Sequence, residues 1–149
     1  MKHWKDQRCA WLALYLAEGL GNVGGKNLLH QFGTPGAIFS AGPAELARVE
    51  GVNTKAIESI CHGRFALDPE KELTKLERCG ARILPYGAET YPSALREIHD
   101  PPILLFIRGK DIPAGLPLVA VVGSRNATYY GLKASERFGS GLGQSGVGV

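Results

Sequence analysis

The sequence predicts a two-part fold, a small helical domain followed by an α/β layer with a mainly parallel sheet. The 149 residues suffice for one ordinary domain or two small ones. Residues 6–62 alternate helix-like segments with glycine turns, whereas strand-like apolar runs alternate with helices from residue 68 onward. We therefore predict a helical domain at residues 1–65 and an α/β domain at residues 66–149.

Composition narrows the class of protein. A hydrophobic content of 44% and a charged content of 21% are typical of a soluble globular chain. The net charge of +3 and the pI of about 8.8 are compatible with nucleic-acid binding without requiring it. No apolar run is long enough for a membrane span, and the N-terminus lacks a signal-peptide cleavage site, which favours the cytoplasm. Three cysteines without CxxC spacing and four scattered histidines predict buried cysteines and no metal site.

The helical part begins with residues Asp6–Glu18, whose apolar side chains on most faces predict a helix packed on several sides. Thr34 and Pro35 form a cap and first position for a short helix that ends near Ser40. Between these two helices we predict a third, at Lys26–Phe32. Four glycines before it are expected to interrupt the helical structure: Gly19, Gly21, Gly24 and Gly25.

The next segment, AELARVEGVNTKAIESI, resembles a helix-hairpin-helix motif, in which hairpin N–H groups contact a DNA phosphate. Gly51 would permit the close approach and Lys55 would add charge. Asn53 stands at the second hairpin glycine, where asparagine tolerates a left-handed backbone. A purely structural helical unit explains the segment equally well. Residues 19–25, GLGNVGG, form a weaker second copy.

The α/β part opens with the most clearly marked helix of the chain. Asp68 is a good N-cap, Pro69 suits the first position, and Gly80 closes the helix. Three apolar runs then predict strands, at Ala81–Pro85, Ile103–Ile107 and Leu118–Val122.

A glycine loop, Gly123-Ser124-Arg125, follows the third strand and precedes a helix that opens near Thr128. A strand that passes through a glycine turn into a helix can form an anion site, because the first helical N–H groups point at the ligand. The loop matches neither G-x-G-x-x-G nor a P-loop, which argues against a dinucleotide or NTP site. One glycine, one hydroxyl and one arginine suit a single phosphate, and Lys133 adds a charge one helical turn later.

The stretch LVAVVGSRNATYYGLKASERF resembles the start of the Rossmann-like domain of the DNA-processing protein A (DprA or Smf) family. The preceding YPSALREIHDPPILLFIRG resembles that family's lead-in, and the helical part is similar to its SAM-like, helix-hairpin-helix-type domain. The resemblance spans the whole chain. It implies a Rossmann-like parallel sheet for the second domain.

The resemblance also implies a function. Family members are bacterial cytoplasmic proteins that bind single-stranded DNA in natural transformation, load the RecA recombinase, and act as homodimers without known catalytic activity or cofactor. By this resemblance Gly123, Ser124 and Arg125 meet the DNA backbone, with Arg125 as the main phosphate contact. The positions that continue the DNA-binding loop into the helix are Thr128, Tyr130 and Gly131, and Tyr129 or Tyr130 offers a stacking face to a base.

One departure from the family's pattern keeps two alternatives open. The family's sheet continues into a second glycine loop, SG.ARGID..AH, whereas this sequence ends at GQSGVGV, so we expect an N-terminal part that ends inside the Rossmann-like domain. One alternative is a Rossmann-like nucleotide hydrolase resembling the phosphoribohydrolase and lysine-decarboxylase-like group, which requires a PGG.GT-type loop. Another is a helix-hairpin-helix module that binds duplex backbones without sequence preference.

Overall fold

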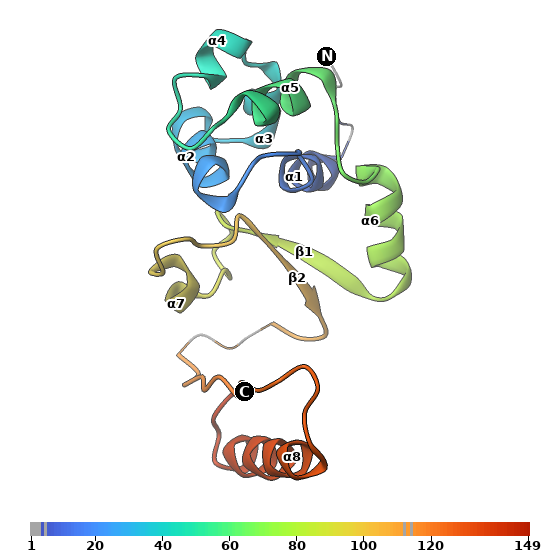
Figure 1. The fold of residues 1–149 in the computed structure, drawn as a ribbon, viewed down its shortest axis with the longest axis vertical. Coiled ribbons are helices and arrows are strands. Elements are labelled where there is room, and N and C mark those ends of the chain that lie inside the picture. The colour runs from blue at the N-terminus through green and yellow to red at the C-terminus, as the bar shows by residue number, and fades with distance from the viewer. Residues whose placement is uncertain (1–3, 5, 112, 114) are drawn as a thin grey trace. The chain divides into compact units, whose positions relative to one another are not determined.

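The computed structural model describes residues 4, 6–111, 113 and 115–149, and the chain divides into two compact units, Met1–Asp111 and Ile112–Val149 (Figure 1). The predicted domain boundary between residues 65 and 66 lies inside the first unit, and that division into domains stays a prediction.

Helices dominate the first unit. Their bounds are α1 (Gln7–Tyr15), α2 (Asn22–Phe32), α3 (Pro35–Ser40), α4 (Pro43–Leu46) and α5 (Thr54–His62). The predicted starts are confirmed, since the Asp6 carboxylate accepts a hydrogen bond from the Arg8 N–H and the Thr34 hydroxyl accepts one from the Ala37 N–H. Apolar side chains from these helices form one core, whose most buried members include Leu12, Leu14, Leu28, Ile38 and Leu46.

The glycines before Lys26 do not all break the chain, contrary to the sequence-based expectation. Gly24 and Gly25 lie inside α2 and are buried. A Cβ at residue 24 would lie 2.4 Å from the carbonyl oxygen of Gly51, and one at residue 25 would lie 3.0 Å from Ile103. These glycines are therefore explained by close packing of α2 against its neighbours.

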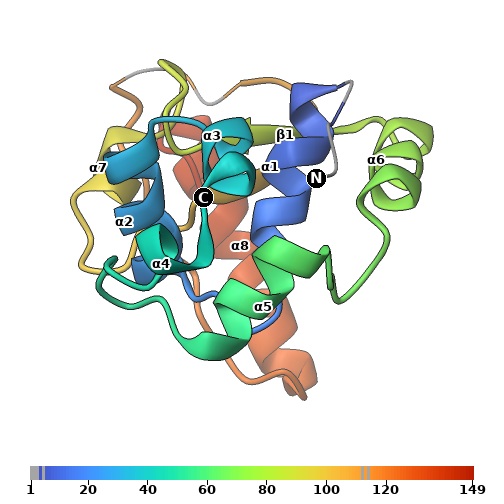
Figure 2. The same cartoon turned by 90° about the horizontal axis from the view of Figure 1, so that it is seen from above.

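Helix α6 (Pro69–Arg78) is confirmed with its predicted cap, because the Asp68 carboxylate accepts hydrogen bonds from the N–H groups of Glu70 and Lys71. The helix contacts α1, which lies between α2 and α6 in both views (Figures 1 and 2). Gly80 then turns the chain with a positive φ of 66° into β1 (Ala81–Pro85), the predicted strand. The second predicted strand is β2 (Leu104–Arg108), displaced by one residue.

The sheet of the first unit has two antiparallel strands, so the predicted parallel pairing is wrong here. Ala81 pairs with Arg108, and Pro85 pairs with Leu104. A parallel pair needs a crossover that usually contains a full helix, whereas the connection between β1 and β2 contains the single-turn α7 (Ser93–Arg96). The buried Tyr91 closes this connection by donating its hydroxyl to the Pro102 carbonyl oxygen at 2.8 Å.

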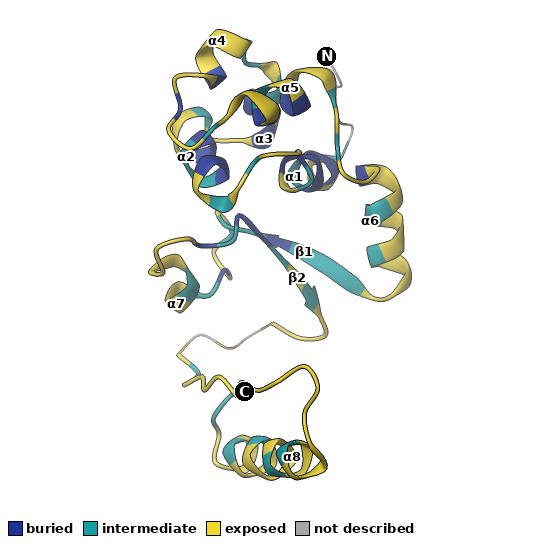
Figure 3. Ribbon diagram, viewed as in Figure 1, coloured by how far each residue is buried: buried dark blue, intermediate teal, exposed yellow. Residues whose placement is uncertain are grey.

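The second unit contains α8 (Tyr129–Gln144), which carries no buried residue (Figure 3). The predicted strand Leu118–Val122 is wrong as a strand, since Leu118 alone forms an isolated parallel bridge, to Gly148. A strand requires a neighbour along its length, and the described part of this unit supplies one only beside Leu118 and Val119. Val122 is 90% exposed. The described structure is thus mixed helix with a small antiparallel sheet, and the Rossmann-like layer stays a prediction.

Cysteine burial is predicted correctly at one position of three. Cys9 is buried in the core, whereas Cys61 and Cys79 are exposed. Cys61 lies on the outer face of α5 and Cys79 follows the last turn of α6, so neither reaches the core.

Among the described residues no group of His, Cys, Asp and Glu is placed to bind a metal ion. The described helices also include none with the length and apolar character to cross a membrane.

Candidate nucleic-acid interface

The glycine loop is an exposed segment with little internal structure of its own. The Ser124 hydroxyl oxygen accepts a hydrogen bond from the Asn126 N–H at 3.3 Å, which leaves the hydroxyl proton available to a ligand. A Cβ built on Gly123 would meet no atom within 4 Å, and the φ of Gly123 is not positive. No neighbour in the described part of the chain therefore requires glycine at this position.

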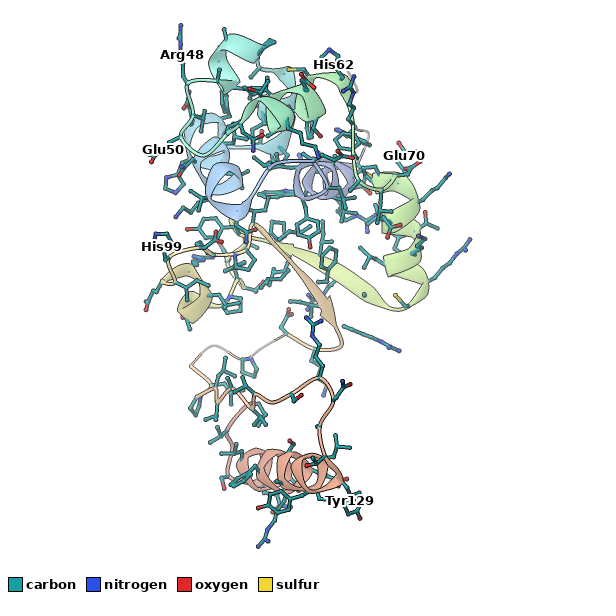
Figure 4. The ribbon with its side chains drawn as sticks, in the orientation of Figure 1. Arg48, Glu50, His62, Glu70, His99 and Tyr129 are labelled. Carbon is teal, nitrogen blue, oxygen red and sulfur yellow. The ribbon has the colours of Figure 1, made fainter. Side chains whose placement is uncertain are left out.

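Helix α8 begins at Tyr129, four residues after Arg125, and the predicted helix start near Thr128 is confirmed. The Thr128 hydroxyl accepts a hydrogen bond from the Gly131 N–H at 3.2 Å and so caps the helix. The N–H groups of Tyr129 and Tyr130 come before the first intrahelical hydrogen bond, and such groups carry the positive end of the helix dipole. Figure 4 shows Tyr129 at this end of α8.

The two predicted cations differ in their surroundings. Arg125 is exposed and takes part in no ion pair among residues 4, 6–111, 113 and 115–149. Lys133 pairs with Glu136, with 2.8 Å between the Lys133 Nζ and a carboxylate oxygen. Both partners are exposed, so this pair adds little stability, but it lowers the local positive charge.

The structure thus places the predicted residues on one continuous segment, namely Gly123, Ser124, Arg125, Thr128, Tyr130, Gly131 and Lys133. It gives Thr128 a local role as the cap of α8. Their contact with DNA stays a prediction. Sequence reasoning missed Asn126, whose N–H holds the Ser124 hydroxyl, and Glu136, whose spacing of three residues from Lys133 on a helix is a readable signal.

A groove of about 660 Å³ runs along one face of α8 and was also missed. Its residues recur at the spacing of helical turns: Tyr130, Lys133, Ala134, Arg137, Phe138, Gly141, Leu142 and Ser145. Tyr130 and Phe138 are 81% and 67% exposed. Apolar positions at this spacing in the sequence indicate such a stripe.

The predicted hairpin between α4 and α5 is present, with Gly51 at a φ of +81°. Asn53 acts differently from the expectation, because its φ of −91° is not left-handed. Its side-chain oxygen instead accepts a hydrogen bond from the Ala56 N–H, which caps α5, and its amide nitrogen donates to the Gly19 carbonyl oxygen at 2.9 Å.

Residues 18–27 and residues 50–55 of the helical part lie against each other. Besides the bond between Asn53 and Gly19, Lys55 forms an ion pair with Glu18 at 3.2 Å, and the Asn27 side chain donates to the Glu50 carbonyl oxygen at 3.0 Å. The cation expected to assist a hairpin phosphate contact is therefore already paired. These contacts are those of a packing unit, and the duplex-binding alternative gains no support from them.

Comparison with known proteins gives a consistent family match. Residues 82–149 match the family model described as DNA recombination-mediator protein A. Protein Smf of Synechocystis sp. is 30% identical over 148 residues, which cover 97% of this chain and 37% of that protein. Protein Smf of Borreliella burgdorferi is 31% identical over 74 residues, covering 50% of this chain and 24% of that protein.

A third relative matches a shorter region more closely. The DNA processing protein DprA of Streptococcus pneumoniae is 44% identical over 54 residues, covering 36% of this chain and 19% of that protein. The chain thus spans little more than a third of the length of the Synechocystis relative and less of the other two. The resemblance predicted from the glycine loop and its lead-in is confirmed.

Proposed function

The chain belongs to the DNA recombination-mediator protein A family, and on this premise we propose that it binds single-stranded DNA through residues 123–128 and the first turn of α8. The family acts in DNA processing as a mediator rather than as a known enzyme. The proposed site accordingly needs groups that hold a phosphate and does not need a nucleophile or a general base.

One observation carries the proposal: an exposed arginine without an ion-pair partner among the described residues lies three residues before the cap of a helix. A guanidinium group offers two parallel N–H donors to phosphate oxygens, and the free N–H groups at the helix start favour the same negative charge. The Ser124 hydroxyl can donate a further hydrogen bond. The open space around Gly123 lets a phosphate approach the backbone closely.

The preference for single strands is supported by two aromatic side chains beside the loop. Tyr129 and Tyr130 are 77% and 81% exposed. An exposed aromatic ring stacks on an unpaired base, a contact worth about 1–3 kcal/mol per base. Bases inside a duplex are already stacked on their neighbours, so tyrosines at this position favour a strand whose bases are free.

The proposal extends to partners that the family membership alone supports. We propose that the protein loads RecA onto the bound strand during DNA uptake in natural transformation, that it acts as a homodimer, and that it works in the cytoplasm without a cofactor. A cofactor-free role agrees with a loop built for one phosphate rather than for a nucleotide.

The test is a binding titration with labelled single-stranded and duplex oligonucleotides over a salt series. Arg125→Ala is compared with Arg48→Ala, which removes the same charge from an exposed side chain of the first unit that points away from the protein (Figure 4). We expect Arg125→Ala to weaken single-strand binding and to reduce the slope of log K against log salt by about 0.7–1, because one phosphate contact is lost. Arg48→Ala should change neither quantity.

The other outcomes point to the alternatives. Equal effects of the two substitutions would show that Arg125 contributes only general charge, which would overturn the proposed site. Stronger binding to duplex than to single strands would favour the helix-hairpin-helix module. Turnover of a nucleotide would favour the hydrolase.

A further inference from the structure

We draw no further inference here: the strongest candidate, the apolar groove along helix α8 lined by Tyr130, Ala134, Phe138 and Leu142, carries nothing because no observation on the described residues shows what covers it.

Discussion

Gly24 packs so closely against Gly51 that a Cβ on residue 24 would lie 2.4 Å from the Gly51 carbonyl oxygen. Gly24 is in the first turn of α2, and Gly51 is in the turn before α5, 27 residues later in the chain. A hydrogen bond from the Asn53 side-chain amide to the Gly19 carbonyl oxygen joins the same two stretches of chain. The start of α2 and the turn before α5 therefore fit together through backbone atoms, and a side chain at residue 24 would separate them.

This contact predicts that Gly24→Ala destabilises the first unit. Alanine favours a helix over glycine by about 1 kcal/mol, but forcing an atom into a filled space costs about 1–3 kcal/mol, and here the obstructing atom is backbone. Thermal and urea unfolding should show a lower midpoint than for the unchanged protein. Gly36→Ala is the matched control, because a Cβ there in α3 has its nearest neighbour 4.0 Å away. An unchanged midpoint for Gly24→Ala, with or without a rise for Gly36→Ala, would contradict the packing described.

The sequence predicted well those features that depend on neighbours along the chain. Asp68, Pro69 and Gly80 fixed the bounds of α6 because capping and the left-handed turn are set by the residues at the helix ends themselves. The strand Ala81–Pro85 was predicted from its own apolar run, which is local as well and begins immediately after that turn.

Features that depend on distant residues were predicted poorly. Gly24 looks like a helix breaker until Gly51 is known to lie against it. The apolar run Leu118–Val122 reads as a strand, but a strand forms only where a second one is available to accept its hydrogen bonds. Similarly, the run of apolar residues in β2 does not encode the direction of its pairing with β1.

The candidate site was predictable from the sequence in some respects and not in others. Its residues are contiguous, so sequence alone could gather Ser124, Arg125 and Thr128 into one loop and place the helix start correctly. The capping role of Thr128 is local and readable. The pairing of Lys133 with Glu136 is also local, because the two residues lie three apart on a helix. That Arg125 has no ion-pair partner among the described residues is not readable in the same way, because it depends on how the surrounding chain folds.

Asp6 predicts an acid-sensitive contribution to stability. Hydrogen bonds to its carboxylate from the side chain and then the backbone N–H of Arg8 hold the pKa of Asp6 below its ordinary value. The ionised form is thus favoured by folding. The resulting stability is present above the pKa of an unfolded aspartate, about 3.9, and is lost as the pH falls through the lower folded pKa.

Asp6→Asn isolates this contribution, because asparagine keeps an oxygen that can cap α1 but does not ionise. We expect the variant to have a lower midpoint of thermal unfolding than the unchanged protein at pH 7, and the two midpoints to converge as the pH falls from about 4 through the lowered pKa of folded Asp6. A constant difference across that range would mean that Asp6 has no shifted titration.

The three thiols predict two classes of reactivity. Cys61 and Cys79 are exposed and should react with a disulfide reagent such as DTNB without unfolding. Burial raises the pKa of the Cys9 thiol and also shields it, so Cys9 should react only as fast as the first unit opens. Replacing Cys61 and Cys79 by serine should remove the fast phase entirely. A fast phase that persists in this double variant would show that Cys9 is accessible in the folded protein.

We predict that the hairpin that carries Lys55 does not contribute to the binding of single-stranded DNA. The ammonium group of Lys55 pairs with Glu18, both partners are exposed, and such pairs contribute about 0–1 kcal/mol to stability. We expect Lys55→Ala to leave the affinity for single-stranded DNA within about twofold of the unchanged protein, since a paired exposed charge adds little to phosphate binding. The same titrations that test Arg125→Ala provide the measurement. A loss as large as that of Arg125→Ala would instead assign the hairpin to the DNA interface.

Thr128 links the order of α8 to the proposed DNA contact. Its hydroxyl caps the helix through the Gly131 N–H, and losing such a cap costs about 1 kcal/mol. Thr128→Ala should therefore speed hydrogen exchange at the Gly131 amide, measured by NMR, and should weaken single-strand binding because the helix start that presents N–H groups to a phosphate frays. Thr128→Ser keeps the hydroxyl and should preserve both. Slow exchange in Thr128→Ala would show that the cap is dispensable. Weak binding by Thr128→Ser with slow exchange retained would show that the threonine methyl group, rather than the order of the helix start, matters to the DNA.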